Sequence, residues 1–192
     1  MRITLSIICL FYFKSTFSQT LNPAAEKVKF AFDKLMADSS NKKMQANYIQ
    51  AFPADTKTFL TVFQTTKFDQ LYMDSYKYLE LFERCGTNSP KEVIDKCIAI
   101  GKNLVWDADA VGQLQKLSVL VAVKNTNIFV DEYKMLDGSN QDNLISFYAD
   151  VENYSAYKIY QDLIVKLKVL GETDISKKME DAREKREKRN DH

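Results

Sequence analysis

The stretch SPKEVIDKCIAIG (residues 89–101) contains the clearest helix start in the chain. Ser89 precedes Glu92 by three residues and Pro90 stands at the first helical position, so the pattern is a capping box with an N1 proline. The apolar residues that follow repeat with helical spacing, namely Val93, Ile94, Cys97 and Ile98. Gly101 is a suitable residue to stop the helix. The stretch therefore predicts one amphipathic helix with defined ends.

Segments with the same apolar spacing lie on both sides of this helix. The expected helices start at Asn22-Pro23, after a break at residues 38–41, at Asp55, at Phe68, at Pro90, near residue 108, near residue 127, after a turn at residues 137–141, and ahead of Tyr157 in a face that ends at Gly171. Five glycines and three prolines are too few for a fold rich in β-turns. We therefore expect an all-α, single compact multi-helix domain. Its successive helix pairs could stack as a small α-solenoid, although no repeat period demonstrates it.

The composition changes after the last amphipathic face. The segment SKKMEDAREKREKRNDH (176–192) has almost no apolar side chains, so it is expected to bury no face. Two acid-before-base pairs support a solvated helix here: Asp181–Lys185 and Glu184–Lys188. The chain is thus expected to consist of a helical domain over residues 19–172 and a charged helical or frayed tail over residues 173–192.

Residues 1–18 have the pattern of a secretory signal peptide. Arg2 precedes an apolar run that is too short for a comfortable membrane span. The small residues Thr16 and Ser18 occupy positions −3 and −1 of a cut before Gln19. A buried N-terminal helix is the alternative. We expect an exported protein of the periplasm or the extracellular space, without a membrane span.

The charge of the chain is nearly balanced, with 27 basic and 26 acidic residues. Without the two basic residues of the signal-like segment, 25 basic residues face 26 acidic ones, and the net charge is −1. A balance of this kind does not favour nucleic acid or an anionic membrane as the partner.

Cys85 and Cys97 remain after such a cleavage, and an exported compartment permits a disulfide between them. If they lie on antiparallel helices joined near residues 86–90, Cys97 is roughly 10 Å along the axis from the turn. Bridged Cα atoms lie within about 7 Å of each other. The bond forms only if the first helix ends early and residues 83–89 fold back. Two buried, small apolar side chains are the alternative, and the sequence leaves both open.

The side chains that most catalytic and cofactor sites require are missing from the sequence. The single histidine, His192, ends the polar tail, so a Ser-His or Cys-His nucleophile is not expected. One histidine and two cysteines cannot close a zinc site. Neither G-x-G-x-x-G nor G-x-x-x-x-G-K-[ST] occurs. We therefore expect no cofactor, no metal and no catalytic residue.

The acidic stretch LVWDADAVGQLQ (104–115) allows two interpretations. Asp107 and Asp109 match positions 1 and 3 of a calcium loop, but Ser118 stands where that loop needs a bidentate glutamate. The other interpretation is a helix start, with Asp107 as the N-cap, Asp109 in the first turn and Trp106 packed in front. Apolar residues keep helical spacing through the stretch, so the helix start is preferred.

Four stretches carry a resemblance to a known group of proteins: FPADTKTFLTVFQ (52–64), LYMDSYKYLELFERC (71–85), WDADAVGQLQ (106–115) and NLISFYADVEN (143–153). Together they resemble an uncharacterised family of small exported all-helical proteins of Bacteroidota, although Leu104-Val105 replaces the usual Gly-Lys. The resemblance implies an all-α fold, an envelope location and no assigned activity. The motif residues would organise the fold and could contribute to a partner surface: Trp106, Asp107, Asp109 and Gln115.

Three functions remain after these exclusions. The leading hypothesis is a non-enzymatic exported protein-binding domain with a protein partner, in its most concrete form a periplasmic immunity protein that occludes an antibacterial effector. Its abundant Tyr and Phe residues could supply interface anchors. An envelope enzyme that uses Asp107 and Asp109 is the first alternative. A small-ligand-binding or structural envelope module is the second.

Overall fold

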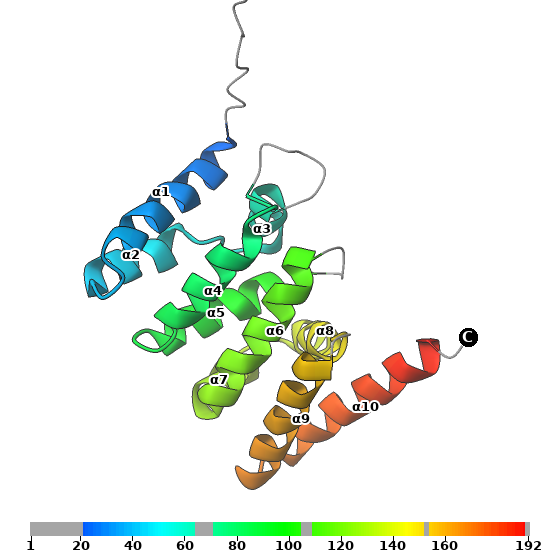
Figure 1. Ribbon diagram of the computed structural model, residues 1–192. Helices are drawn as coiled ribbons and strands as arrows, with labels where there is room; N and C mark the ends of the chain where they lie inside the picture. The colour runs from blue at the N-terminus through cyan, green and yellow to red at the C-terminus, as the bar shows by residue number, and fades with distance from the viewer. Residues whose placement is uncertain (1–20, 64–70, 105–108, 152–153, 191–192) are drawn as a thin grey trace, which may run out of the picture.

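The computed structural model describes residues 21–63, 71–104, 109–151 and 154–190 (Figure 1). Over these residues it contains ten α-helices and no strand. The helices are α1 (Pro23–Ala37), α2 (Lys42–Ala51), α3 (Thr56–Phe63), α4 (Ser75–Cys85), α5 (Pro90–Gly101), α6 (Asp109–Lys124), α7 (Thr126–Lys134), α8 (Gly138–Ala149), α9 (Tyr154–Val169) and α10 (Thr173–Asn190). The expected all-α single domain is confirmed. The proposed signal peptide over residues 1–18 lies outside the described residues.

The helices stack in two rows along the molecule (Figure 1). One row consists of α2, α4, α6 and α9, and the other of α1, α3, α5, α8 and α10, while α7 packs on α5, α6 and α9. Each helix packs chiefly on helices no more than three places away along the chain. This is the arrangement of a short α-solenoid, in which every helix pair covers its neighbours. Among the described helices, none is long and apolar enough to cross a membrane.

Aromatic side chains fill the space between the rows. In the N-terminal half, Phe52 stacks on Phe82 with ring centroids 3.8 Å apart and ring planes 6° apart. In the C-terminal half, Phe129 stacks on Tyr148 at 5.8 Å. All four rings are almost completely buried, and a buried side chain of this size contributes roughly 1.5–3 kcal/mol to folding. Most of the aromatic side chains that the structure describes therefore belong to the core.

Several helix ends lie where the sequence predicts them. The Asn22 side chain accepts a hydrogen bond from the Ala24 amide at 2.9 Å, and Asp55 accepts one from the Thr58 amide at 2.8 Å. Gly171 ends α9 with φ +79°, a conformation that favours glycine. The chain reverses there through paired amide-to-carbonyl bonds, Glu172 to Leu167 at 2.9 Å and Gly171 to Lys168 at 3.0 Å.

The stretch at residues 89–101 is a helix, but its ends differ from the prediction. Ser89 is the N-cap residue of α5, yet its side chain makes no capping hydrogen bond, so the capping box is not formed. Gly101 is the last helical residue and is followed by Lys102 in a right-handed conformation, so Gly101 is not a left-handed stop. A Cβ at Gly101 would lie 2.7 Å from Cδ1 of Phe147, which shows that this glycine allows α8 to approach closely.

Two other boundaries were predicted wrongly. The helix expected from Phe68 begins at Ser75, and residues 71–74 approach it as a turn. The expected turn at residues 137–141 is the start of α8, because the Asp137 side chain accepts the Asn140 amide hydrogen at 2.9 Å as an N-cap. Asp, Gly, Ser and Asn are favoured both in turns and at helix N-termini, so their composition could not distinguish the two.

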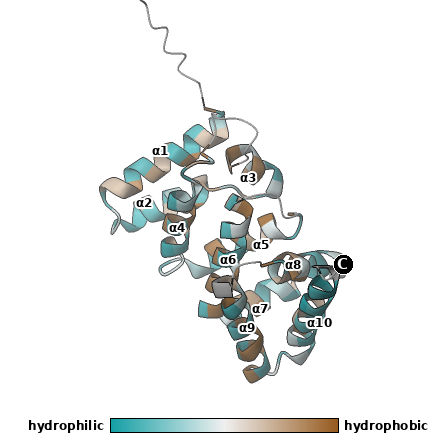
Figure 2. Cartoon of the chain, turned by 45° about the vertical axis from the view of Figure 1, so that its right-hand side comes forward, coloured by the Kyte–Doolittle hydropathy of each residue, from teal (hydrophilic) through white to brown (hydrophobic). Residues whose placement is uncertain are grey.

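The charged segment is a helix as expected, but the prediction that it buries no face is wrong. Ile175 and Met179, four residues apart on α10, are buried against α8 and α9. Arg186 is 8% exposed, and its Nε donates to Asp150 Oδ1 at 2.6 Å. Two apolar residues at helical spacing and one inward-facing arginine are therefore enough to dock a helix that is otherwise hydrophilic (Figure 2).

Cys85 and Cys97 are free and buried in the structure, which corresponds to the second of the two alternatives for this pair. Burial raises the pKa of Cys85 to about 11 and that of Cys97 to about 12. Thiols of this kind are poorly ionised at neutral pH and therefore unreactive.

We expect the Cys85 and Cys97 thiols of the folded protein to react with Ellman's reagent at pH 8 roughly 100-fold more slowly than those of an unfolded chain, because reaction requires opening of the core. In guanidinium chloride without reductant, Cys85 and Cys97 should both react at once. If neither reacts until a reductant is added, the two residues are bridged and the free-thiol arrangement is wrong.

Candidate functional site

The acidic motif is divided between the surface and the core. Trp106 and Asp107 lie outside the described residues. Asp109 is the first residue of α6 and is exposed, and its Oδ2 accepts a hydrogen bond from the Tyr72 hydroxyl at 3.1 Å. Gln115 is 1% exposed, and its Nε2 donates to the Phe147 carbonyl at 2.9 Å. Gln115 therefore links α6 to α8.

The calcium-loop interpretation does not fit the backbone. Helix α6 is continuous from Asp109 through Ser118, which are positions 3 and 12 of the loop pattern. A calcium loop turns sharply at position 6, which is Gly112, but α6 passes straight through this residue. Over the described part of the chain, no three His, Cys, Asp or Glu side chains are gathered as a metal site requires. The helix interpretation is confirmed for residue 109 onward.

A groove of about 420 Å³ lies between α9 and α10. The α9 wall carries the aromatic and aliphatic residues Tyr157, Tyr160, Ile164 and Val165, together with the polar residues Gln161 and Lys168. The α10 wall is polar, with Glu180, Arg183, Glu184 and Glu187. Smaller hollows of about 230 Å³ between α4 and α6 and about 260 Å³ between α8 and α10 have no comparable contrast between an apolar and an acidic wall.

Arg183 holds the two walls of the groove together. Its guanidinium lies 4.4 Å from the centroid of the Tyr157 ring. Its Nη1 donates to the carbonyls of Val151 at 2.8 Å and Ala149 at 3.2 Å, and its Nε pairs with Glu187 at 2.7 Å. With 16% of its side chain exposed, Arg183 is committed to these partners and sets the shape of the groove.

The floor of the groove is also fixed. The Tyr160 hydroxyl donates to the Met179 carbonyl at 2.6 Å, and both residues are fully buried. Burial raises the pKa of Tyr160, so the phenol remains a neutral donor at physiological pH. A floor held by a buried hydrogen bond of this kind gives the groove a defined, preformed shape.

The rim combines exposed apolar side chains with exposed carboxylates. Val165 is 59% exposed and Val169 is 82% exposed, four residues apart on α9. On the α10 side of the groove, Glu180, Glu184 and Glu187 are exposed. Each of these carboxylates is in an ion pair: Glu180 with Lys168 at 2.6 Å, Glu187 with Arg183 at 2.7 Å and Glu184 with Lys188 at 2.6 Å. The rim therefore carries paired charges beside exposed apolar groups.

Sequence reasoning identified the amphipathic face of α9 but missed the groove beside it. Val165 and Val169 lie outside the buried stripe that contains Tyr160, Leu163 and Leu167. This offset is readable in the sequence as two valines four residues apart on an otherwise polar helix flank. The acidic wall that α10 contributes to the groove could not be anticipated, because this segment was predicted to be a solvated helix that packs on nothing.

The charged side chains of the groove are engaged with one another and with neighbouring backbone. The carboxylates lie on an open rim in ion pairs, and the half-buried Arg183 bonds to the carbonyls of Ala149 and Val151. Comparisons with protein-family models, with curated proteins and with solved structures find no match for this chain.

Proposed function

We propose that this protein is a non-enzymatic protein-binding domain that receives an apolar segment of a protein partner in the α9–α10 groove. The observation that carries the proposal is the pair Val165 and Val169, which stand exposed on a helix beside a preformed hollow. Exposed apolar side chains next to a groove with a polar rim are typical of protein interaction sites.

The fixed geometry of the groove supports this proposal. Its walls are joined by Arg183 and its floor by Tyr160, so little conformational freedom is lost when a partner binds. Tyr157 supplies an aromatic surface of the kind that dominates binding energy in interfaces. Binding of this kind needs complementary shape and no chemistry.

In its most concrete form, the proposed function is that of an exported immunity protein, which would act outside the cytoplasm by occluding an effector. The signal-like pattern of residues 1–18 is the basis for this location. An immunity protein acts by covering its target. A rigid helical stack with a partly apolar groove is suited to this role.

The test is site-specific photo-crosslinking in the producing cell, with the crosslinker at Val165 and, as a control, at Met73. Met73 is equally apolar and 78% exposed, but it lies ahead of α4, far along the chain from the groove. We expect one defined protein to crosslink at position 165 and not at position 73. Its affinity for the purified protein should fall at least tenfold with Val165→Glu and remain unchanged with Met73→Glu.

Two results would contradict the proposal. One is equal crosslinking at both positions, which would mean that position 165 reports only random encounters. The other is a partner whose affinity is insensitive to Val165→Glu while circular dichroism shows that the variant is folded. Either result would move the binding surface elsewhere.

A further inference from the structure

We propose that two copies of the chain exchange helix α10, because the turn at Gly171 can open and join α9 and α10 into one continuous helix. In the exchanged dimer, α10 of each copy packs on α8 and α9 of the other copy. This goes beyond the proposed function, since it concerns how the chain associates with itself. The α9–α10 groove is retained in the dimer, with one wall from each copy.

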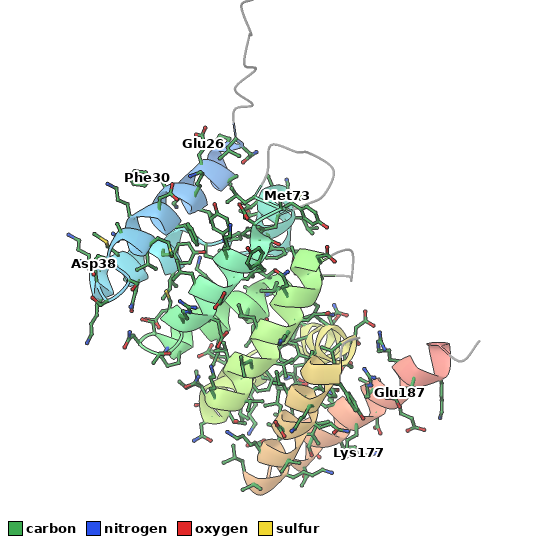
Figure 3. The ribbon with its side chains drawn as sticks, in the orientation of Figure 1. Glu26, Phe30, Asp38, Met73, Lys177 and Glu187 are labelled. Carbon is green, nitrogen blue, oxygen red and sulfur yellow. The ribbon has the colours of Figure 1, made fainter. Side chains whose placement is uncertain are left out.

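Helix α10 has the position that an exchange requires. It is the last of the described helices and packs chiefly on α8 and α9, at one end of the stack (Figure 1). Lys177 and Glu187 on α10 lie at the end of the stack opposite to Phe30 on α1 (Figure 3). A terminal helix of this kind can leave its place without breaking the contacts among the preceding helices, and exchange of such an element is a low-cost route to a dimer.

The surface that receives α10 is complementary to it, because α10 already occupies this surface within one chain. Ile175 and Met179 are buried there, and the Tyr160 hydroxyl donates to the Met179 carbonyl at 2.6 Å. Lys168 on α9 pairs with Glu180 on α10 at 2.6 Å. Each of these contacts can form in the same way between two copies, so the second copy needs no new surface.

A single short turn separates α9 from α10. Helix α9 ends at Val169 and α10 begins at Thr173. Gly171, with φ +79°, is the one residue with a positive φ in the described part of the chain, whereas an α-helix needs a φ near −60°. Residues 154–190 contain no proline that would interrupt a continuous helix. A change of conformation centred on Gly171 therefore straightens the hairpin.

The pattern of contact residues fits one continuous helix as well. The residues through which α9 and α10 pack repeat every three or four positions on both sides of Gly171, which occupies the intervening position: Tyr157, Tyr160, Ile164 and Lys168, then Ile175, Met179 and Arg183. A straight helix therefore carries both contact surfaces along one side. Two such helices, antiparallel about a twofold axis near Gly171, place α9 of each copy against α10 of the other.

The conformation of Gly171 sets the balance between the closed monomer and the exchanged dimer. Glycine adopts a positive φ readily, which favours the closed turn. A Cβ at residue 171 would meet no heavy atom within 4 Å, so alanine at this position acts only through the backbone. Gly171→Ala strains the closed turn and also favours a continuous helix. It should therefore shift the balance towards the dimer without altering any contact of α10.

The first experiment is sedimentation velocity on the full chain, refolded from urea at low and at high protein concentration. The samples are the wild type, Gly171→Ala and the control Gly138→Ala, which makes the same exchange of residues away from the hinge. Strain at the turn is worth roughly tenfold per copy, so the dissociation constant of the Gly171→Ala dimer should be roughly 100-fold below that of the wild type. Gly138→Ala should dimerise as the wild type does.

Carbodiimide coupling then distinguishes exchange from simple association. The reagent joins ion-paired side chains by an amide bond, and Lys168 Nζ lies 2.6 Å from Glu180 Oε1. The samples are refolded from an equal mixture of isotope-labelled and unlabelled chains. Closed monomers give Lys168–Glu180 crosslinks within one isotope, whereas we expect the Gly171→Ala dimer to give crosslinked peptides that combine both isotopes.

A Gly171→Ala variant that folds and remains monomeric at both concentrations would overturn the proposal. A dimer whose Lys168–Glu180 crosslinks stay within one isotope would also overturn it, since α10 is then still in its own chain. If Gly171→Ala does not fold, the wild type refolded at high concentration is the readout. Mixed-isotope crosslinks that disappear when two glycines are inserted after Gly171 then support the exchange, because a longer turn closes without strain, and their absence from the wild type overturns it.

Discussion

A chain that ends at Glu172 should lose most of its folding stability, even though the deleted residues 173–192 are almost entirely hydrophilic. The deletion removes Ile175 and Met179 from the core and breaks the hydrogen bond that the buried Tyr160 hydroxyl donates to the Met179 carbonyl. Truncation of a single buried Ile or Met costs about 2–5 kcal/mol, so the loss of both costs about 4–10 kcal/mol. That is comparable with the total stability of about 5–15 kcal/mol for a domain of this kind.

Urea denaturation followed by circular dichroism measures this loss. The control is a chain that ends at Lys188, which retains Ile175, Met179 and Arg186, the large buried side chains described in α10, and should unfold within about 0.5 kcal/mol of the full chain. Met179→Ala in the full chain should reproduce about 2–5 kcal/mol of the deletion effect. Equal stability of the two truncated chains would show that α10 is a solvated tail after all.

The wrong prediction that α10 buries no face shows which features of a helix can be predicted from its sequence and which cannot. The helix starts at Asn22 and Asp55 and the chain reversal at Gly171 each depend on a few neighbouring residues. The local sequence is therefore enough to predict them. Whether Ile175 and Met179 are buried depends on α8 and α9, which lie far along the chain. An apolar stripe of two residues is too weak to indicate a face until its partner surface is known.

The groove could not be predicted for the same reason. Its apolar wall belongs to α9 and its acidic wall to α10, and only their packing turns two ordinary helix flanks into one site. The motif around residue 109 is the reverse case. Its residues are conspicuous in the sequence, but their side chains point to different parts of the molecule. Asp109 faces solvent while Gln115 bonds to Phe147 in the core. Within the described residues, this unusual composition thus marks the start of a helix.

Gly101→Ala is the second change expected to have a large effect, because the close packing of α5 on α8 has no room for a methyl group. A Cβ at residue 101 would lie 2.7 Å from Cδ1 and 2.8 Å from Cε1 of Phe147, and 3.3 Å from Cδ1 of Leu144. Phe147 is 3% exposed, and its carbonyl accepts the buried hydrogen bond from Gln115, so neither ring nor backbone can move away freely. Overpacking of this kind costs about 1–3 kcal/mol, which exceeds the gain of about 0.5–1 kcal/mol that alanine brings to a helix.

Gly138→Ala is the matched control, because a Cβ at the first residue of α8 meets no heavy atom within 4 Å. It should leave the free energy of unfolding unchanged or raise it by about 0.4–1 kcal/mol, since alanine restricts the unfolded chain. The urea midpoint should therefore fall for Gly101→Ala and stay or rise for Gly138→Ala. Adding Phe147→Leu to Gly101→Ala should cost less than it does in the wild type, because the smaller side chain relieves the overlap. Strict additivity of these two changes would mean that Gly101 and Phe147 do not meet, and that α5 and α8 do not pack as closely as the structure shows.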